Sequence, residues 1–352
     1  MKKICFFLIY FFAFTCLLNA QEKIKYVYIG SYDEKMYCID DETGKKVWQF
    51  KTGHLIESNP TVYKKRVYFA SDDGKLYCLD ALTGEKFWDK KIGEGTNYSS
   101  PTIVDDVLYI GSYEKKLYSI NPENGDEHWI FKAGGRIFSD PLVINGRVYV
   151  GSLDDKVYAV DAQTGQLVWK TNVDEMVKTD LAYYDGKIYA YNNKEELYAL
   201  DSESGKILWK KELGDEYTNS SPIIHEGRLY VGTTDEELYC LDAETGDTIW
   251  RFYDDDDIHS TPAVYNGKVY FGCDYDDVHA LDIETGEEVW DKDLDARVYA
   301  SPAVLNGRVY IGNGDDELFC LDAETGDRIW KFKGDGKIVT RPAFLLENDI
   351  LQ

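Results

Sequence analysis

Residues 280–290 read Ala280-Leu281-Asp282-Ile283-Glu284-Thr285-Gly286-Glu287-Glu288-Val289-Trp290, and a stretch of this kind occurs eight times in the chain. Its polar position recurs every 40 or 41 residues, at Asp40, Asp80, Asn121, Asp161, Asp201, Asp242, Asp282 and Asp322. A glycine follows four residues later in every copy, and a tryptophan follows eight residues later. These tryptophans are Trp48, Trp88, Trp129, Trp169, Trp209, Trp250, Trp290 and Trp330, which are all the tryptophans of the chain. Because a fixed period of this length is typical of repeat architectures, it governs the fold prediction.

One copy of the repeat predicts four short β-strands. Residues 262–265 are apolar, Asn266-Gly267 is a preferred hairpin turn, and residues 268–272 are rich in β-branched and aromatic residues. Two further short runs, 278–281 and 287–290, follow after an acidic turn and after the Asp-to-Gly turn. Four antiparallel strands repeated eight times predict an all-β fold: an eight-bladed β-propeller that occupies residues 21–352 as a single domain.

The two ends of the repeat region complement each other. Residues 26–50 supply a second, third and fourth strand with no first strand before them, whereas residues 341–345 supply a first strand with nothing after it. We expect the C-terminal strand to pair beside Tyr28 and to complete the eighth blade, which leaves no open sheet edge at the seam.

The recurring residues have structural explanations. The aspartate can accept hydrogen bonds from backbone amides of a tight turn, and the glycine supplies the left-handed residue that such a turn requires. The tryptophan can wedge between neighbouring sheets and bury a large apolar area. We therefore interpret all eight tryptophans as structural residues.

Residues 1–20 resemble a secretory signal peptide. Lys2 and Lys3 precede an apolar run, residues 4–18, and a small residue, Ala20, stands at the expected cleavage site. This predicts export to the periplasm, the extracellular space or the cell surface. Cys16 raises the alternative of a lipid anchor, but the residues before it fit a lipoprotein signal poorly, so a soluble exported chain is favoured. Membrane association is then expected only through a partner or through that less favoured anchor.

The net charge limits the classes of binding partner, and the positions of the cysteines bear on whether disulfides form. The formal net charge of −25 disfavours binding to nucleic acid and to anionic membranes, and it suits either a cationic partner or simple solubility. Four of the five cysteines after the leader, Cys38, Cys78, Cys240 and Cys320, share one repeat position where other copies have serine or alanine. We interpret them as small buried residues and expect no disulfide framework.

Catalytic and metal-binding patterns are scarce in the sequence. None of the five histidines has the spaced partners of a metal site or a nucleophile relay, and His279 stands where other copies have tyrosine. Acidic turns such as Asp72-Asp73-Gly74 lack the spaced oxygen ligands of a calcium loop. The sequence therefore predicts no metal site.

The motif Ala-x-Asp-x-x-Thr-Gly-x-x-x-Trp, seen in residues 280–290, resembles the repeat of pyrroloquinoline-quinone (PQQ)-type propellers over residues 24–348. The resemblance implies the fold, and the superfamily includes both quinoprotein alcohol dehydrogenases and non-enzymatic BamB-type outer-membrane assembly factors. The dehydrogenases carry a vicinal disulfide, calcium ligands and long insertions. This sequence has no adjacent cysteines and no interruption of its 40–41 spacing, so we expect neither the cofactor nor an enzyme.

Loops that cross one end of the central channel are the expected binding region, because binding commonly evolves on loops of a rigid scaffold. The candidate residues stand one or three positions before the start of each first strand. They are Glu57, Asn59, Tyr98, Phe138, Asp140, Lys178, Asp180, Asn219, His259, Tyr299 and Arg341. The alternative is that these solvated positions vary without binding anything.

These observations lead to one functional hypothesis and two alternatives. The hypothesis is a non-catalytic, monomeric exported scaffold that binds a protein or peptide partner, in the assembly of the cell envelope or outer membrane. One alternative is a PQQ-dependent alcohol or sugar dehydrogenase. The other is a glycan-binding module that uses exposed aromatic residues such as Tyr98 and Tyr299.

Overall fold

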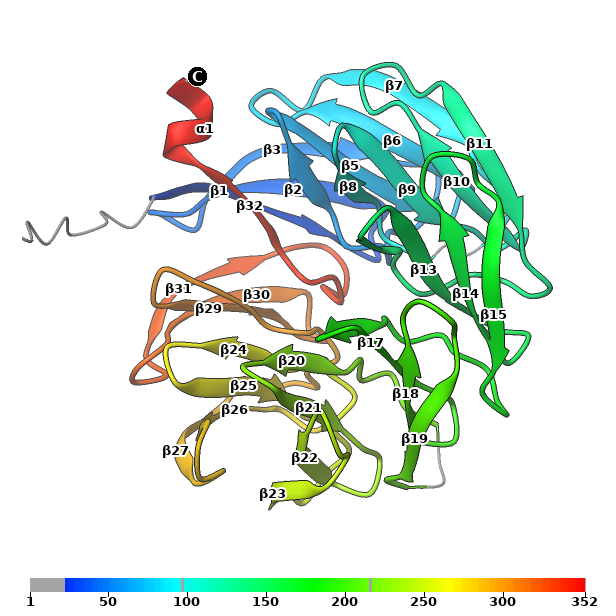
Figure 1. Ribbon diagram of the computed structural model, residues 1–352. Helices are drawn as coiled ribbons and strands as arrows, with labels where there is room; N and C mark the ends of the chain where they lie inside the picture. The colour runs from blue at the N-terminus through cyan, green and yellow to red at the C-terminus, as the bar shows by residue number, and fades with distance from the viewer. Residues whose placement is uncertain (1–22, 96–97, 215–216, 352) are drawn as a thin grey trace, which may run out of the picture.

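The computed structural model describes residues 23–95, 98–214 and 217–351, and the predicted signal peptide lies outside the described residues. The described chain forms eight four-stranded antiparallel sheets arranged as a ring, the β-propeller that the repeat predicts (Figure 1). Its helical content is a single short helix, α1 (Glu347–Leu351), among the described residues. No helix in this part of the chain has the length and apolar character needed to cross a membrane.

Apart from strand β32, blades 1 to 4 come from the N-terminal half of the chain. Blade 1 consists of β32 (Ala343–Leu346), β1 (Ile24–Gly30), β2 (Lys35–Asp40) and β3 (Lys46–Lys51). Blade 2 consists of β4 (Thr61–Tyr63), β5 (Arg66–Ser71), β6 (Lys75–Asp80) and β7 (Lys86–Lys91). Blade 3 consists of β8 (Thr102–Val104), β9 (Val107–Gly111), β10 (Lys116–Ile120) and β11 (Glu127–Lys132). Blade 4 consists of β12 (Leu142–Ile144), β13 (Arg147–Ser152), β14 (Lys156–Asp161) and β15 (Leu167–Asn172).

Blades 5 to 8 complete the ring. Blade 5 consists of β16 (Ala182–Tyr184), β17 (Lys187–Tyr191), β18 (Glu196–Asp201) and β19 (Ile207–Glu212). Blade 6 consists of β20 (Ile223–His225), β21 (Arg228–Gly232), β22 (Glu237–Asp242) and β23 (Thr248–Tyr253). Blade 7 consists of β24 (Ala263–Tyr265), β25 (Lys268–Gly272), β26 (Asp277–Asp282) and β27 (Glu288–Asp293). Blade 8 consists of β28 (Ala303–Leu305), β29 (Arg308–Gly312), β30 (Glu317–Asp322) and β31 (Arg328–Lys333).

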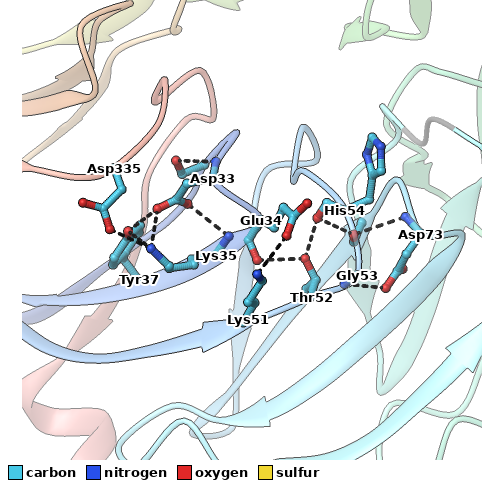
Figure 2. A network of polar contacts seen from close by, with 12 residues as sticks. Asp33, Glu34, Lys35, Tyr37, Lys51, Thr52, Gly53, His54, Asp73 and Asp335 are labelled. Atoms are coloured by element: carbon cyan, nitrogen blue, oxygen red, sulfur yellow. Dashed lines mark hydrogen bonds and ion pairs between the residues drawn. The ribbon is translucent and has the colours of Figure 1, made fainter.

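The C-terminal strand closes the ring as predicted. Strand β32 pairs antiparallel with β1, with Ala343 opposite Tyr28 and Phe344 opposite Val27, so the last strand of the chain is the first strand of blade 1 (Figure 1). Polar contacts reinforce the seam: Lys35 lies between Asp33 of its own blade and Asp335 of the connection before β32, 3.0 and 2.7 Å from their carboxylates (Figure 2).

Tryptophan side chains join each blade to the next. In all eight copies the indole Nε1 donates a hydrogen bond of 2.7 to 3.2 Å to a backbone carbonyl of the following blade. Trp330 of blade 8 donates to Asp41 of blade 1, which repeats the same contact across the seam. A tyrosine of each second strand packs beside the tryptophan, with ring centroids 5.7 to 6.0 Å apart. The tryptophans therefore have the predicted structural role, which is to join neighbouring blades of the chain.

The core consists of eight apolar clusters, each shared by two neighbouring blades. One blade cannot shield both of its faces, so burial of apolar area against its neighbours is the main stabilising contribution. The five cysteines that the structure describes are all buried and free, as the repeat positions indicate.

One face of the ring gathers two kinds of loop. The connections between successive blades lie there together with the turns between second and third strands, because antiparallel strands return their ends to alternate faces. Backbone hydrogen bonds join the two kinds of loop, such as Asp72 N to Leu55 O at 3.0 Å and Asn193 N to Met176 O at 2.9 Å. We call this surface the loop face.

Candidate functional site

A circle of side-chain hydrogen bonds surrounds the central channel. Two positions before each observed first strand, the backbone N–H of one blade donates to the side-chain oxygen of the same position in the next blade. Seven such bonds of 2.5 to 3.0 Å run in sequence around the ring, through Arg341, Asn59, Ser100, Asp140, Asp180, Ser221, Thr261 and Ser301. The circle is open between Ser301 and Arg341, since a guanidinium group has no acceptor. We call these eight residues the belt.

The belt places two acidic residues side by side. Asp140 N donates to Asp180 Oδ1 at 2.7 Å, and Asp140 Oδ1 accepts from Ser100 N. Burial first, and then the charge of Asp180, raise the pKa of Asp140 to about 7, while Arg341 acts in the opposite direction. Burial also raises the pKa of Asp180. The pKa values of both carboxyl groups are therefore raised together, and the positive charge of Arg341 opposes both shifts.

A cavity of about 540 Å³ adjoins the belt. Its wall contains the belt residues Asn59, Ser100, Asp140 and Arg341, and it extends along the first strands of blades 1 to 3 as far as Asp349 of α1. Polar and apolar side chains alternate in this wall, and the only basic group among its lining residues is Arg341.

The other candidate residues stand four positions before each observed first strand, in the connections between blades on the loop face. Tyr98 and Phe138 contact each other edge to face, with centroids 4.9 Å apart, and Phe138 also contacts Tyr113. The Arg136 guanidinium stacks on the Tyr113 ring at 3.7 Å. Tyr98 is 46% exposed, so this cluster presents an aromatic surface to solvent.

Glu57 and Lys178 occupy other parts of the loop face. Glu57 accepts a hydrogen bond from the Tyr32 hydroxyl, and burial is the main reason why the pKa of Glu57 is raised. Lys178 donates to Asn219 and lies over the Tyr217 ring, 3.3 Å from its centroid. Burial lowers the pKa of Lys178 to about 7. The structure thus pairs Tyr98 with Phe138 and Lys178 with Asn219.

The remaining candidates are more separate. The Tyr299 hydroxyl accepts a hydrogen bond from Arg297 Nη1 at 2.9 Å, beside Lys337. His259 lies 3.9 Å from the Asp257 carboxylate. Of the predicted site residues, Asn59, Asp140, Asp180 and Arg341 belong to the belt, where Asn59 and the two aspartates accept bonds that tie neighbouring blades.

The loop face carries buried polar atoms that lack a hydrogen-bond partner within the protein. Among the described residues they include Glu57 Oε2, Asp154 Oδ1, Asn193 Oδ1, Glu195 Oε2, Asp256 Oδ2, His259 Nδ1 and Asp274 Oδ1, besides the Ser152 hydroxyl. Five of these atoms are carboxyl oxygens, which only accept hydrogen bonds while the group is ionised, and the amide oxygen of Asn193 is also an acceptor. Because unpaired buried acceptors are costly, each of them needs a donor from outside the chain, either water or a bound partner.

These atoms concentrate in one sector. Asn193, Glu195, Asp256, His259 and Asp274 all come from loops of blades 5 to 7, and we call them the acidic sector. Burial raises the pKa of Glu195 to about 7, and the charges of Asp235 and Asp257 act in the same direction. A positive charge arriving here would favour the ionised form of Glu195.

Sequence reasoning missed most of the acidic sector. It placed partner binding only on the connections between blades, which contain His259. The turns between second and third strands, which contain Asn193, Glu195 and Asp274, were weighed only as calcium loops. The order of four antiparallel strands in each repeat could have located these turns. It places the turn after the second strand and the connection after the fourth strand on the same face.

The residues present do not fit the quinone cofactor that the resemblance raises. The vicinal disulfide associated with it has no counterpart, since the described cysteines are free and buried at separate positions. The quinone is a polycarboxylate, whereas the unpartnered groups near the channel are themselves acceptors, and Asp140 and Asp180 stand in the belt.

The fold and the repeat define this protein as a PQQ-type repeat β-propeller. More specifically, the chain belongs to the family whose sequence model is described as outer membrane protein assembly factor BamB, which matches residues 20–104, 74–178, 153–273 and 257–348. No curated protein sequence matches the chain.

Solved structures agree on the fold. BamB from Moraxella catarrhalis is similar with a TM-score of 0.69 and 18% identity, covering 81% of this chain and 90% of that one. The computationally designed Ika8 protein has a TM-score of 0.73 and 18% identity, covering 81% and 89%. The quinohemoprotein alcohol dehydrogenase ADHIIG from Pseudomonas putida HK5 has a TM-score of 0.69 and 14% identity, covering 82% and 68%. At these identities the similarity concerns architecture, which a binding protein and an enzyme share.

Proposed function

We propose that this protein is a non-catalytic scaffold of the cell envelope that binds a partner protein through its loop face and acts in outer-membrane protein assembly. The observation that carries the proposal is the gathering of unpartnered buried acceptors on that face. The family description supports the process, and the predicted signal peptide supports export.

The chemistry of the loop face specifies the partner segment. The acidic sector offers oxygen acceptors, so the partner should supply lysine or arginine side chains or free backbone N–H groups. The Tyr98–Phe138 cluster offers aromatic surface for an apolar or aromatic anchor. The net negative charge of the molecule as a whole would speed the encounter with a basic segment.

Site-specific photo-crosslinking in cells tests the face. A crosslinker replaces Tyr217, which is 54% exposed on the loop face, or Glu85, which is exposed on the opposite face. We expect a discrete adduct from position 217 and none from position 85, with the partner identified by mass spectrometry. Equal adducts from both positions would contradict binding through the loop face.

Purified partner then tests the acidic sector. The triple variant Glu195→Gln, Asp256→Asn, Asp274→Asn should weaken binding at least about tenfold, since charged pairs at an interface commonly contribute more than 1 kcal/mol each. The matched control, Glu85→Gln, Glu226→Gln, Glu287→Gln, removes the same charge from exposed turns of the opposite face and should leave the affinity unchanged. Equal losses in the two variants would mean that only net charge matters.

The dehydrogenase alternative has its own test. Purified protein incubated with the quinone and calcium, then desalted, should show no quinone absorbance and no oxidation of alcohols or sugars. Retained cofactor together with turnover would overturn the non-catalytic assignment.

A further inference from the structure

Blade 7 and the connection that leads into it bring together three residues of metal-ligand type from three separate segments. Asp254 begins the connection after β23, Cys273 follows β25, and His279 lies in β26. His279 Nε2 is 3.0 Å from Asp254 Oδ2 and 3.6 Å from Cys273 Sγ, and the three ligand atoms all lie within 4.8 Å of one another. The side chains are nearly buried: Asp254 is 11% exposed, and His279 is 8% exposed.

The internal repeat shows that this combination is specific to one blade. At the position of Asp254 the other copies have Thr52, Ile92, Ala133, Val173, Leu213, Leu294 and Gly334. At the position of Cys273 they have Ser31, Ser71, Ser112, Ser152, Asn192, Thr233 and Asn313. At the position of His279 they have Tyr37, Tyr77, Tyr118, Tyr158, Tyr198, Tyr239 and Phe319. The propeller therefore does not need ligand-type residues here, and three of them replace the usual residues at contacting positions of blade 7 and the connection before it.

Surrounding residues hold the imidazole in the orientation that a metal ligand requires. The ring of His279 stacks on Phe271 with centroids 5.0 Å apart and contacts Phe252 on another side. Its Nδ1 lies 2.8 Å from Glu288 Oε1, which leaves Nε2 directed at Asp254 and Cys273. A carboxylate on the distal nitrogen of a ligating histidine is the usual second contact in metal sites, because it fixes the tautomer and the ring.

The separations suit a tetrahedral ion of the zinc class. With about 2.3 Å to sulfur and about 2.0–2.1 Å to nitrogen, tetrahedral coordination places the two ligand atoms about 3.6 Å apart. The Sγ–Nε2 separation of 3.6 Å in the structure agrees with this value. The Oδ2–Nε2 separation of 3.0 Å is slightly shorter than such geometry requires, so a small outward rotation of the Asp254 carboxylate would complete it.

We propose that Asp254, Cys273 and His279 bind one zinc-class divalent transition-metal ion, with Glu288 orienting the histidine and a fourth coordination position open to water. Binding would release the protons that the thiol and the imidazole Nε2 carry in the metal-free protein. The thiolate excludes magnesium and calcium as preferred ions, since these hard cations select oxygen ligands.

Metal content after chelation and reloading tests the proposal. Protein stripped with a chelator is incubated with equimolar zinc chloride or magnesium chloride and desalted, and the metal is then measured by mass spectrometry. We expect about one zinc per chain and no retained magnesium. With cobalt in place of zinc, a thiolate-to-cobalt charge-transfer band should appear, which reports Cys273 directly without any variant.

Substitutions of the proposed ligands test where the ion binds. Residues from other copies of the repeat are used so that the fold is kept. Cys273→Ser and His279→Tyr restore residues found in the other copies, and each should abolish zinc retention. Glu288→Gln keeps all three ligands and should weaken the affinity about 10–100-fold. The control is Asp276→Asn, Asp293→Asn, which removes two carboxylates of a neighbouring acidic cluster in the same blade and should retain the ion.

The outcomes separate the alternatives. Zinc lost from the ligand variants and kept by the control supports the site. Failure of the unmodified chain to retain zinc would overturn the proposal and leave His279 as an ion-paired residue between Asp254 and Glu288. Zinc retained by the ligand variants, but lost from the control, would assign the ion to the exposed carboxylates and overturn it equally.

Discussion

Glycine and tryptophan recur together because they meet across a blade boundary. The glycine of each Asp-to-Gly turn lies directly against the tryptophan of the preceding blade, so a side chain at the glycine would collide with the indole. A Cβ on Gly205 would lie 2.6 Å from Trp169, and the φ of Gly205 is +71°. The conformation and the close approach both require glycine at this position.

A comparison of two glycine variants separates these two requirements. Gly186 also has a positive φ, +78°, but a Cβ there would meet nothing within 4 Å. We expect Gly186→Ala to cost about 1–2 kcal/mol for the left-handed conformation alone. Gly205→Ala should cost about 1–3 kcal/mol more, because the added methyl group overpacks the tryptophan contact. Urea unfolding measures both, and equal losses would contradict a role for the indole contact.

Tyr191 shows how one copy departs from the repeat without losing its packing. Six other copies have glycine at this position, and a Cβ on Gly30, for example, would lie 2.4 Å from the Ile56 side chain. In the loop that follows blade 5, Thr218 stands at the place of Ile56. The Tyr191 side chain is fully buried in the apolar cluster that blades 5 and 6 share.

The belt consists of one residue from each of eight connections between blades. Because two of these residues are Asp140 and Asp180, we expect the stability of the protein to depend on pH. The pKa of Asp140 is raised in the folded chain, so the contribution of this residue to stability is present at low pH and is lost as pH rises through its folded pKa of about 7. Ionisation of Asp140 next to Asp180 thus opposes folding at neutral and alkaline pH.

Asp140→Asn removes this titration and keeps the oxygen that accepts from Ser100 N. Relative to the unmodified protein, the variant should gain stability as pH rises from about 4 to about 7, on the order of 1 kcal/mol since the channel admits water. Urea unfolding across this range gives the measurement. Asp105→Asn, on a hairpin turn away from the belt, is the control for charge. Parallel stability curves for Asp140→Asn and the unmodified protein would show that Asp140 does not titrate in this range.

Strand β32 is the element on which ring closure depends. It pairs with β1, buries Leu345 and contributes Phe344 to the core between blades 8 and 1. Deletion of residues 343–352 should therefore cost at least about 3 kcal/mol and expose the edge of β1 to association. Thermal unfolding and size-exclusion chromatography measure the two effects. Deletion of residues 348–352 alone keeps β32 and should leave the chain monomeric with a smaller loss.

Charge acts on the molecule as a whole. With a formal net charge of −25, repulsion among carboxylates opposes the compact state, and most of the ion pairs that the structure shows lie at the surface, where each contributes little. Added salt should screen more repulsion than attraction.

We expect the Tm to rise by a few degrees between about 0.01 M and about 0.15 M sodium chloride, as the Debye length falls from about 30 Å to about 8 Å. Differential scanning calorimetry measures the shift. Near pH 4, where many carboxylates are protonated, the same change of salt should have a smaller effect. A Tm that falls with salt at neutral pH would show that ion pairs outweigh repulsion.

The architecture was predictable because the same pattern of strand and turn residues occurs eight times in the sequence. The period fixed the number of blades, the turn residues fixed the hairpins, and the split of one repeat between residues 26–50 and 341–345 indicated the closing strand. For the candidate site, the sequence located the channel loops, but it did not show that Asn59, Asp140 and Asp180 form a belt between blades.

The sequence by itself thus determined the strands, the blade count and the closure, since each depends on periodicity and on contacts within or between adjacent repeats. Only the tertiary structure decided which side chains meet at the channel, which acceptors on the loop face stay unpartnered, and that Asp254, Cys273 and His279 converge in blade 7. The physical reason is that such contacts depend on where loops from different strands end in space. Residue spacing along one chain does not specify that position.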